Sequence, residues 1–230
     1  MEAIILAGGL GTRLRSVVTD LPKAMAPVNG RPFLAHLLDA LIGARFDLAI
    51  LAVGYKSEQI HEHFGERYQS LPLRYSVETE PLGTGGAIKL AMEHVDTTTV
   101  FVLNGDTFLE LDYKAMLAAH NEANATLTVA VHAVADASRY GALDIAGGRV
   151  RGFFEKKSSG PGSINAGVYL LSREMLARYN FPRAFSFETD FLVPRVQEIR
   201  PLAFRTQGIF IDIGVPEDYA RAQDVLDVRQ

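Results

Sequence analysis

The first half of the chain alternates short, continuous apolar runs with segments whose apolar residues recur at helical spacing. Continuous runs of this length are typical of strands that are buried on both faces, as in a parallel sheet. They predict strands at 3–7, 48–53, 73–77 and 99–103. Helical spacing predicts helices at 31–44, 56–66 and 84–94. Strands that alternate with helices indicate βαβ units and a doubly wound α/β sheet.

The second half of the chain is richer in strands and in Gly/Ser turns. A helix is expected near 112–123, followed by strands at 125–134, 141–155 and 163–171, a helical piece at 187–199, a strand pair around 201–213 and a last helix at 216–228. We expect a single domain, 1–230, in which residues 1–135 bind a nucleotide and the more mixed residues 136–230 close the site.

Composition limits the classes of function. A hydrophobic content of 48% supports a large core, and a formal net charge of −4 argues against a general nucleic-acid binder. The absence of cysteine excludes disulfides and thiolate chemistry. Because the N-terminal apolar run stops after five residues and no window approaches the roughly 18 apolar residues of a spanning helix, we expect a cytoplasmic protein without a membrane partner.

A glycine-rich turn follows the first predicted strand, in the sequence LAGGLGTRL. Glycines let the backbone approach a ligand, and the cations Arg13 and Lys23 match phosphate groups. Leu14 stands where the dinucleotide-binding pattern needs its third glycine, and Arg13-Leu14 is not the Lys-Ser/Thr of a P-loop. The turn therefore predicts a triphosphate site of another kind, and a purely structural turn is the alternative.

Two aspartates adjoin apolar segments: one follows a predicted strand, and the other lies within a predicted strand. Asp106 follows the run at 99–103, at the strand edge where α/β sheets bind ligands, and Asp212 lies between two isoleucines. Together they make a two-carboxylate Mg²⁺ site plausible, because Mg²⁺ takes one or two carboxylates plus substrate phosphates. A plain Asn-Gly turn and a solvent-facing strand position are the respective alternatives.

Two further segments carry polar groups suited to a nucleotide base or a sugar. Glu78 and Glu80 precede a glycine turn, and a glutamate can accept from two adjacent N–H donors, which guanine offers and uracil does not. The alternative is a turn with Thr84 as the cap of the next helix. Glu155-Lys156 and Asn165 offer groups that sugar hydroxyls and a phosphate use, although a Glu-Lys-Lys run is often only a solvated surface. His61 and His63 show no metal spacing and are expected at the surface.

The motifs LAGGLGTRL, PKAMAPV, EPLGTGGA, NGD, FEK, NAGVY and DIG resemble, in this order, those of the sugar-1-phosphate nucleotidylyltransferases. The likeness covers residues 3 to about 220. Within the family, LNGDTF and INAGVYLL are most similar to guanylyltransferases that act on D-glycero-α-D-manno-heptose 1-phosphate. The resemblance implies a Rossmann-like, doubly wound mixed sheet of the nucleotide-diphospho-sugar transferase type, with Mg²⁺ as cofactor.

The resemblance also implies a role for each matching residue. Arg13 would bind the triphosphate and Lys23 the reacting phosphate, while Asp106 and Asp212 would hold the metal. The nucleotide would contact Leu6, Gly8, Gly9, Gly11, Thr12, Glu78, Glu80, Gly83, Thr84 and Gly85. The sugar phosphate would contact Gly141, Glu155, Lys156 and Asn165. The aliphatic surroundings of Asp212 depart from many relatives, and no C-terminal β-helix domain is expected.

The expected reaction joins GTP and a sugar 1-phosphate and releases pyrophosphate. Mannose 1-phosphate with GTP, or an amino-sugar 1-phosphate with UTP, are alternatives within this class. A catalytically silent nucleotide-sugar sensor and a nicotinamide-dependent dehydrogenase are alternatives from other classes. We expect no nucleic-acid partner, and assembly into a homo-oligomer stays open.

Overall fold

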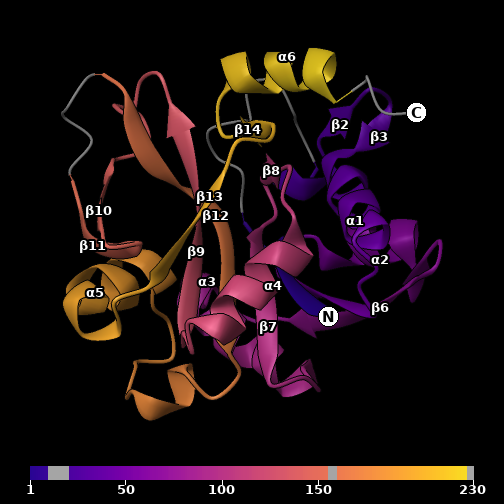
Figure 1. The fold of residues 1–230 in the computed structure, drawn as a ribbon. Coiled ribbons are helices and arrows are strands. Elements are labelled where there is room, and N and C mark those ends of the chain that lie inside the picture. The colour runs from indigo at the N-terminus through magenta and orange to yellow at the C-terminus, as the bar shows by residue number, and fades with distance from the viewer. Residues whose placement is uncertain (10–20, 155–159, 227–230) are drawn as a thin grey trace.

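The buried apolar runs form the centre of a large mixed sheet in a computed structural model, which describes residues 1–9, 21–154 and 160–226 (Figure 1). The strands of this sheet are β1 (Glu2–Leu6), β4 (Leu48–Val53), β5 (Arg67–Tyr68), β6 (Leu71–Val77), β7 (Thr99–Asn104), β9 (Leu127–Val134), β10 (Leu143–Ala146), β11 (Arg149–Phe153), β12 (Gly162–Ser172) and β13 (Leu202–Thr206). Their order is β10-β11-β13-β9-β12-β7-β1-β4-β6-β5.

The pairing directions confirm the predicted mixed, doubly wound sheet. Strand β1 lies parallel to both β4 and β7, and β4 is parallel to β6. Strand β12 is antiparallel to β7 and β9, and β13 is parallel to β9. Two small sheets lie beside the large one. They pair β2 (Pro27–Val28) with β3 (Arg31–Pro32), and β8 (Thr107–Leu109) with β14 (Phe210–Asp212).

Helices cover both faces of the sheet because its central strands are apolar on both sides. The α-helices are α1 (Phe33–Gly43), α2 (Ser57–Phe64), α3 (Gly83–Ala91), α4 (Tyr113–Glu122), α5 (Val193–Ile199) and α6 (Pro216–Val225). Shorter helical turns are η1 (Lys23–Met25), η2 (Met92–His94), η3 (Leu176–Arg178) and η4 (Phe187–Leu192). In the view of Figure 1, α4 crosses in front of the sheet and α6 lies over β14.

The alternation of side chains along β1 builds two cores. Ile5 packs into the cluster that contains Leu38 of α1, whereas its neighbour Ile4 packs into the cluster that contains Ile88 of α3. All six residues of β4 are buried. A strand that is apolar on both faces is stable only between two helical layers, which is why the continuous runs predicted this architecture.

The predicted strand pair at 201–213 needs a correction. It forms two strands, but β13 joins the large sheet, and β14 pairs instead with β8. Strand β8 was not predicted because three residues are too few to show a periodicity. The predicted helix at 31–44 begins only at Phe33, since Arg31–Pro32 pairs with Pro27–Val28 and the Phe33 N–H donates to the Ala26 carbonyl at 2.9 Å.

The other predicted helices and strands lie within a few residues of their predicted bounds, and residues 227–228 of the predicted last helix lie outside the described residues. His61 and His63 lie on the exposed side of α2, as predicted. Among the described residues, no helix is long and apolar enough to cross a membrane.

Candidate active site

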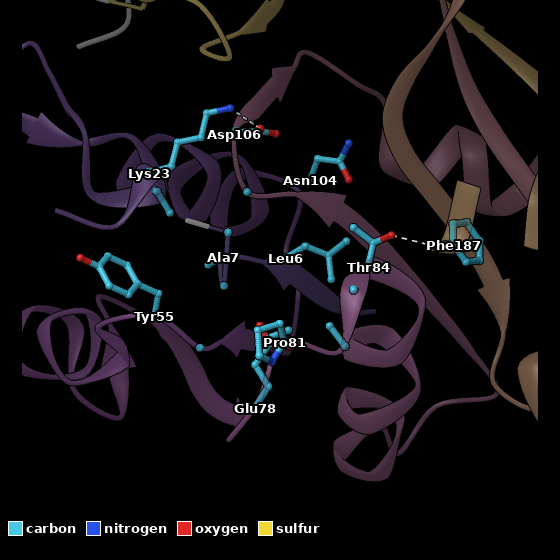
Figure 2. Close-up of a pocket in the computed structure, with 18 of the residues that line it drawn as sticks. Leu6, Ala7, Lys23, Tyr55, Glu78, Pro81, Thr84, Asn104, Asp106 and Phe187 are labelled. Carbon is cyan, nitrogen blue, oxygen red and sulfur yellow. Dashed lines mark hydrogen bonds and ion pairs between the residues drawn. The ribbon is translucent and has the colours of Figure 1, made fainter. Parts of the chain in front are cut away.

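The carboxyl ends of four parallel strands open into a cavity of about 800 Å³ (Figure 2). Leu6 to Gly9 follow β1, Gly54 and Tyr55 follow β4, Glu78 follows β6, and Asn104 to Asp106 end β7. Strand β1 lies between β4 and β7 in the sheet. The chain continues from β1 to β4 on one side of β1, and the later strand β7 lies on its other side. Crevices of this kind, where the strand order reverses, are where open α/β sheets bind ligands.

Glu78 lies at the end of the cavity formed by β6 and β4. Its Oε2 accepts from the Leu82 N–H at 3.1 Å. A Cβ placed on Gly8 would lie 2.7 Å from Oε1 of Glu78, and one on Gly54 would lie 2.6 Å away. A side chain at either position would therefore displace this carboxylate. Burial raises the pKa of Glu78, and the Leu82 N–H partly opposes that shift.

The rest of the predicted base-binding turn is divided between the cavity and the protein core. Glu80, Gly83 and Thr84 line the cavity, and Glu80 pairs with Arg183 at 2.5 Å. Gly85 packs against the ring of Phe185 and does not line the cavity. The assignment of this turn to nucleotide binding stays a prediction.

Thr84 does not cap α3, which corrects that alternative. The N-cap of α3 is Leu82, and it has no side-chain cap bond. Instead, the hydroxyl of Thr84 accepts from the Phe187 N–H at 2.9 Å, a contact drawn in Figure 2. The base-binding turn is thereby tied to the second half of the chain.

Lys23 and Asp106 meet in the cavity. Lys23 lies in η1, and its ammonium donates to Oδ2 of Asp106 (Figure 2). The backbone carbonyl of Asp106 accepts from the Ile213 N–H at 3.0 Å, which joins the Asn-Gly-Asp turn to the segment that carries Asp212. Pairing of β8 with β14 places Thr107 opposite Asp212. Two motifs that are about a hundred residues apart in sequence thus form one structure.

Asp212 lies close enough to Asp106 for their charges to repel each other. Burial raises the pKa of Asp212, the charge of Asp106 raises it further, and Lys23 opposes both effects. Its Oδ1 accepts from the Gly214 N–H at 2.7 Å. Asp212 itself does not line the cavity as Asp106 does.

The donor set at this point fits a magnesium ion that is completed by a substrate. The described residues contain no group of three or more His, Asp or Glu side chains that could hold a metal alone. Two carboxylates with a nearby lysine are compatible with Mg²⁺ when phosphate oxygens and water fill the other positions.

A polar triad on the second half of the chain borders the same cavity. Asn165 Nδ2 donates to the Tyr169 hydroxyl at 2.7 Å and to Oε1 of Glu188 at 2.9 Å. The Tyr169 hydroxyl also donates to Oε1 of Glu188, at 2.5 Å. Tyr169 and Glu188 line the cavity, whereas Asn165 lies behind them and Gly141 lies away from it. The sugar-binding assignments of Asn165 and Gly141 stay predictions.

Five predicted site residues lie outside the residues that the structure describes. They are Gly11, Thr12, Arg13, Glu155 and Lys156.

The sequence did not indicate several residues that line the cavity. Tyr55 and Asn104 each adjoin a glycine of a predicted turn, and that neighbourhood was the available signal. Tyr169 ends the NAGVY motif without a predicted role. Glu188 had no local signal, because its partners are distant in sequence.

The sequence matches the family described as nucleotidyl transferase over residues 2–227. D-glycero-alpha-D-manno-heptose 1-phosphate guanylyltransferase of Aneurinibacillus thermoaerophilus is 43% identical over 226 residues, which cover 98% of each chain. The protein of the same name from Campylobacter jejuni subsp. jejuni is 42% identical over 95% of this chain and 97% of its own. A crystal structure of HddC from Yersinia pseudotuberculosis complexed with GMP-PN is 41% identical, with a TM-score of 0.86 over 97% of this chain and 98% of its own.

These matches span nearly the whole chain. The protein belongs to the nucleotidyl transferase family, and its fold is that of the nucleotide-diphospho-sugar transferases.

Proposed function

We propose that this nucleotidyl transferase moves GMP from GTP to D-glycero-α-D-manno-heptose 1-phosphate and releases pyrophosphate. The observation that carries the proposal is the distribution of groups along one cavity. A partly buried carboxylate, Glu78, lies at one end, and Lys23 and Asp106 line the same cavity as an ion pair, with Asp212 close to Asp106. The names of two relatives that match over nearly their whole length support the choice of GTP and of the sugar.

Glu78 would accept hydrogen bonds from the edge of guanine that carries N–H donors. Guanine presents two adjacent N–H donors, and a carboxylate accepts from both. The Leu82 N–H already occupies Oε2 and fixes the direction of the carboxylate. Uracil offers a single donor at the corresponding edge and would leave part of this partly buried acceptor unpaired, which is costly.

The reaction needs positioning and charge neutralisation rather than a covalent intermediate. An oxygen of the sugar 1-phosphate attacks the α-phosphorus of GTP, and the bond to pyrophosphate breaks in line. The attacking oxygen is already anionic, so no general base is required. Lys23 would hold the phosphate under attack, and Arg13, as the family resemblance implies, the departing pyrophosphate.

Asp106 and Asp212 would hold Mg²⁺. When bound, the ion neutralises charge on the nucleotide phosphates and orients them. Lys23 neutralises Asp106 in their ion pair. Binding of the triphosphate would give Lys23 a second anionic partner, so the lysine can turn from the carboxylate to the phosphate.

The two halves of the chain would divide the substrates between them. Residues 1–135 would bind the nucleotide, and residues 136–230 the sugar 1-phosphate, with Glu155 and Lys156 contributing as the resemblance implies.

A panel of four NTPs against heptose, mannose and amino-sugar 1-phosphates, followed by pyrophosphate release, tests the proposal. We expect turnover to be fastest with GTP and the heptose 1-phosphate. A preference for UTP or for mannose 1-phosphate would reassign the substrate. Binding of nucleotide sugars without any pyrophosphate release would instead identify a silent sensor.

A further inference from the structure

We propose that Glu188 is a substrate-binding residue that accepts a hydrogen bond from a hydroxyl of the sugar 1-phosphate, and that Tyr169 and Asn165 position it. This inference rests on the proposed function and adds a residue that determines specificity for the sugar. It follows from which polar atoms of this triad are engaged and which face the cavity.

The two carboxylate oxygens of Glu188 have different surroundings. Oε1 accepts from the Tyr169 hydroxyl at 2.5 Å and from Asn165 Nδ2 at 2.9 Å. Among the described residues, none donates a hydrogen bond to Oε2. Because Glu188 lines the cavity, this second oxygen is the acceptor that a ligand can reach. A carboxylate fixed on one side and open on the other is suited to bind a hydroxyl.

Both N–H donors of the Asn165 amide are engaged within the protein. Both donor bonds of its amide go to Tyr169 and Glu188, and its Oδ1 accepts from the Gly167 N–H at 3.1 Å. The Gly167 bond also fixes which side of the amide carries oxygen. Asn165 therefore positions Glu188 and Tyr169 through its two donors, and its Oδ1 can accept one bond beyond that from Gly167.

Tyr169 gives the triad a rigid donor. It is 1% exposed and packs edge-on against Phe187. Burial and the charge of Glu188 raise the pKa of its hydroxyl well above the ordinary value, so the hydroxyl stays protonated and donates at every working pH. Such a buried donor needs its acceptor, because an unpaired polar group in the core is costly.

The order of strands assigns Glu188 to the sugar rather than to the nucleotide. Glu78 follows β6, and Tyr169 lies on β12, with β4, β1 and β7 between them. At a strand spacing of 4.7–4.9 Å, this separation is about 19 Å across the sheet. Asp106, which would face the phosphates, follows the intervening strand β7. The triad therefore lies beyond the phosphates as counted from the base, and Figure 2 shows Phe187, the neighbour of Glu188, across the cavity from Tyr55.

Glu188→Gln tests the proposal. Glutamine keeps an acceptor oxygen for Tyr169 and Asn165 but presents an amide donor where Oε2 stood. We expect kcat/KM for the sugar 1-phosphate to fall about 10- to 100-fold, the usual loss for a hydrogen bond to a charged group, while KM for GTP stays unchanged. Tyr169→Phe keeps the carboxylate but loosens it, so we expect a smaller loss for the same substrate.

A series of monodeoxy sugar 1-phosphates identifies the contacted hydroxyl without relying on the variants alone. We expect one analogue to lose as much activity with the wild-type enzyme as the natural sugar loses with Glu188→Gln, and that analogue to show no further loss with the variant. Glu198→Gln is the matched control, because Glu198 accepts from the Tyr179 hydroxyl at 2.9 Å on the exposed surface. We expect it to leave all constants unchanged.

Three results would overturn the assignment: unchanged kcat/KM for the sugar, an equal effect of Glu188→Gln on every deoxy analogue, or a loss that follows GTP and disappears with 2′- or 3′-deoxy-GTP. The last result would assign Glu188 to the ribose. Failure of the wild-type enzyme to release pyrophosphate with any sugar 1-phosphate would overturn the proposed function itself. An active enzyme that is insensitive to Glu188→Gln would overturn only this inference.

Discussion

The ammonium of Lys23 forms an ion pair with the carboxylate of Asp106, across 83 positions of sequence. Lys23 is assigned to the reacting phosphate, and Asp106 is assigned to the metal ion. The pair compensates two functional charges within the protein. It also places the lysine where the triphosphate and its metal ion must enter.

Lys23→Ala should lower kcat far more than it changes folding. Loss of one preorganised charge that stabilises the transition state typically costs about 10²–10³ in rate. The ion pair is partly solvated, since Asp106 is 32% exposed, so the free energy of unfolding should change by no more than about 1 kcal/mol. Pyrophosphate release and urea unfolding measure the two effects. Lys89→Ala, on the exposed side of α3, is the control; near-normal turnover of Lys23→Ala would remove Lys23 from the mechanism.

Asp212→Asn should stabilise the fold while it abolishes activity. The raised pKa of Asp212 means that the folded state favours its protonated form, so this stability is present below the unfolded pKa and is lost as pH rises through the folded pKa. An asparagine has no charge to bury and can still accept from the Gly214 N–H. The variant should therefore have the higher free energy of unfolding at about pH 7, and the difference should vanish toward about pH 4, where aspartates protonate.

Chemical unfolding at several pH values, without added metal, measures the effect of Asp212→Asn. Turnover should fall at least about 10²-fold if Asp212 holds a charge that the reaction needs. A variant less stable than the wild-type protein at neutral pH would contradict the proximity of Asp212 and Asp106.

Glu78→Gln should weaken the preference for GTP. Glutamine can keep the bond from the Leu82 N–H, but it replaces one acceptor with a donor that faces the donors of guanine. We expect kcat/KM for GTP to fall about 10- to 100-fold, with a much smaller change for UTP. Glu80→Gln is the matched control, since Glu80 is exposed and already paired with Arg183. If Glu80→Gln lost more of the GTP preference than Glu78→Gln, Glu80 would be the residue that recognises the base.

Gly167→Ala should destabilise the protein and distort the site. Gly167 has φ +70°, and a Cβ there would lie 2.7 Å from Nδ2 of Asn104. Gly148 has the same φ, but a Cβ there would meet nothing within 4 Å. Gly148→Ala should therefore cost only the backbone strain, about 1–2 kcal/mol, and Gly167→Ala should cost more and also reduce turnover. Equal losses in urea unfolding would show that Asn104 moves aside freely.

Local patterns in the sequence determined the central sheet and the edge where the site lies. The continuous apolar runs at 48–53 and 99–103 could be stable only as strands covered on both faces, and parallel strands bring their carboxyl ends to one edge. Glu78 and Asp106, which directly follow such strands, were therefore predictable as neighbours of one crevice.

The tertiary structure alone decided which polar groups meet across that crevice. The ion pair of Lys23 with Asp106, the pairing of β8 with β14, and the triad of Asn165, Tyr169 and Glu188 join segments that are distant in sequence. Periodicity reports burial within one element and carries no information on the path of the loops between elements. Asn165 shows the difference most clearly: its motif made it a candidate to touch the sugar, and only the folded chain shows that its two amide donors bind Tyr169 and Glu188.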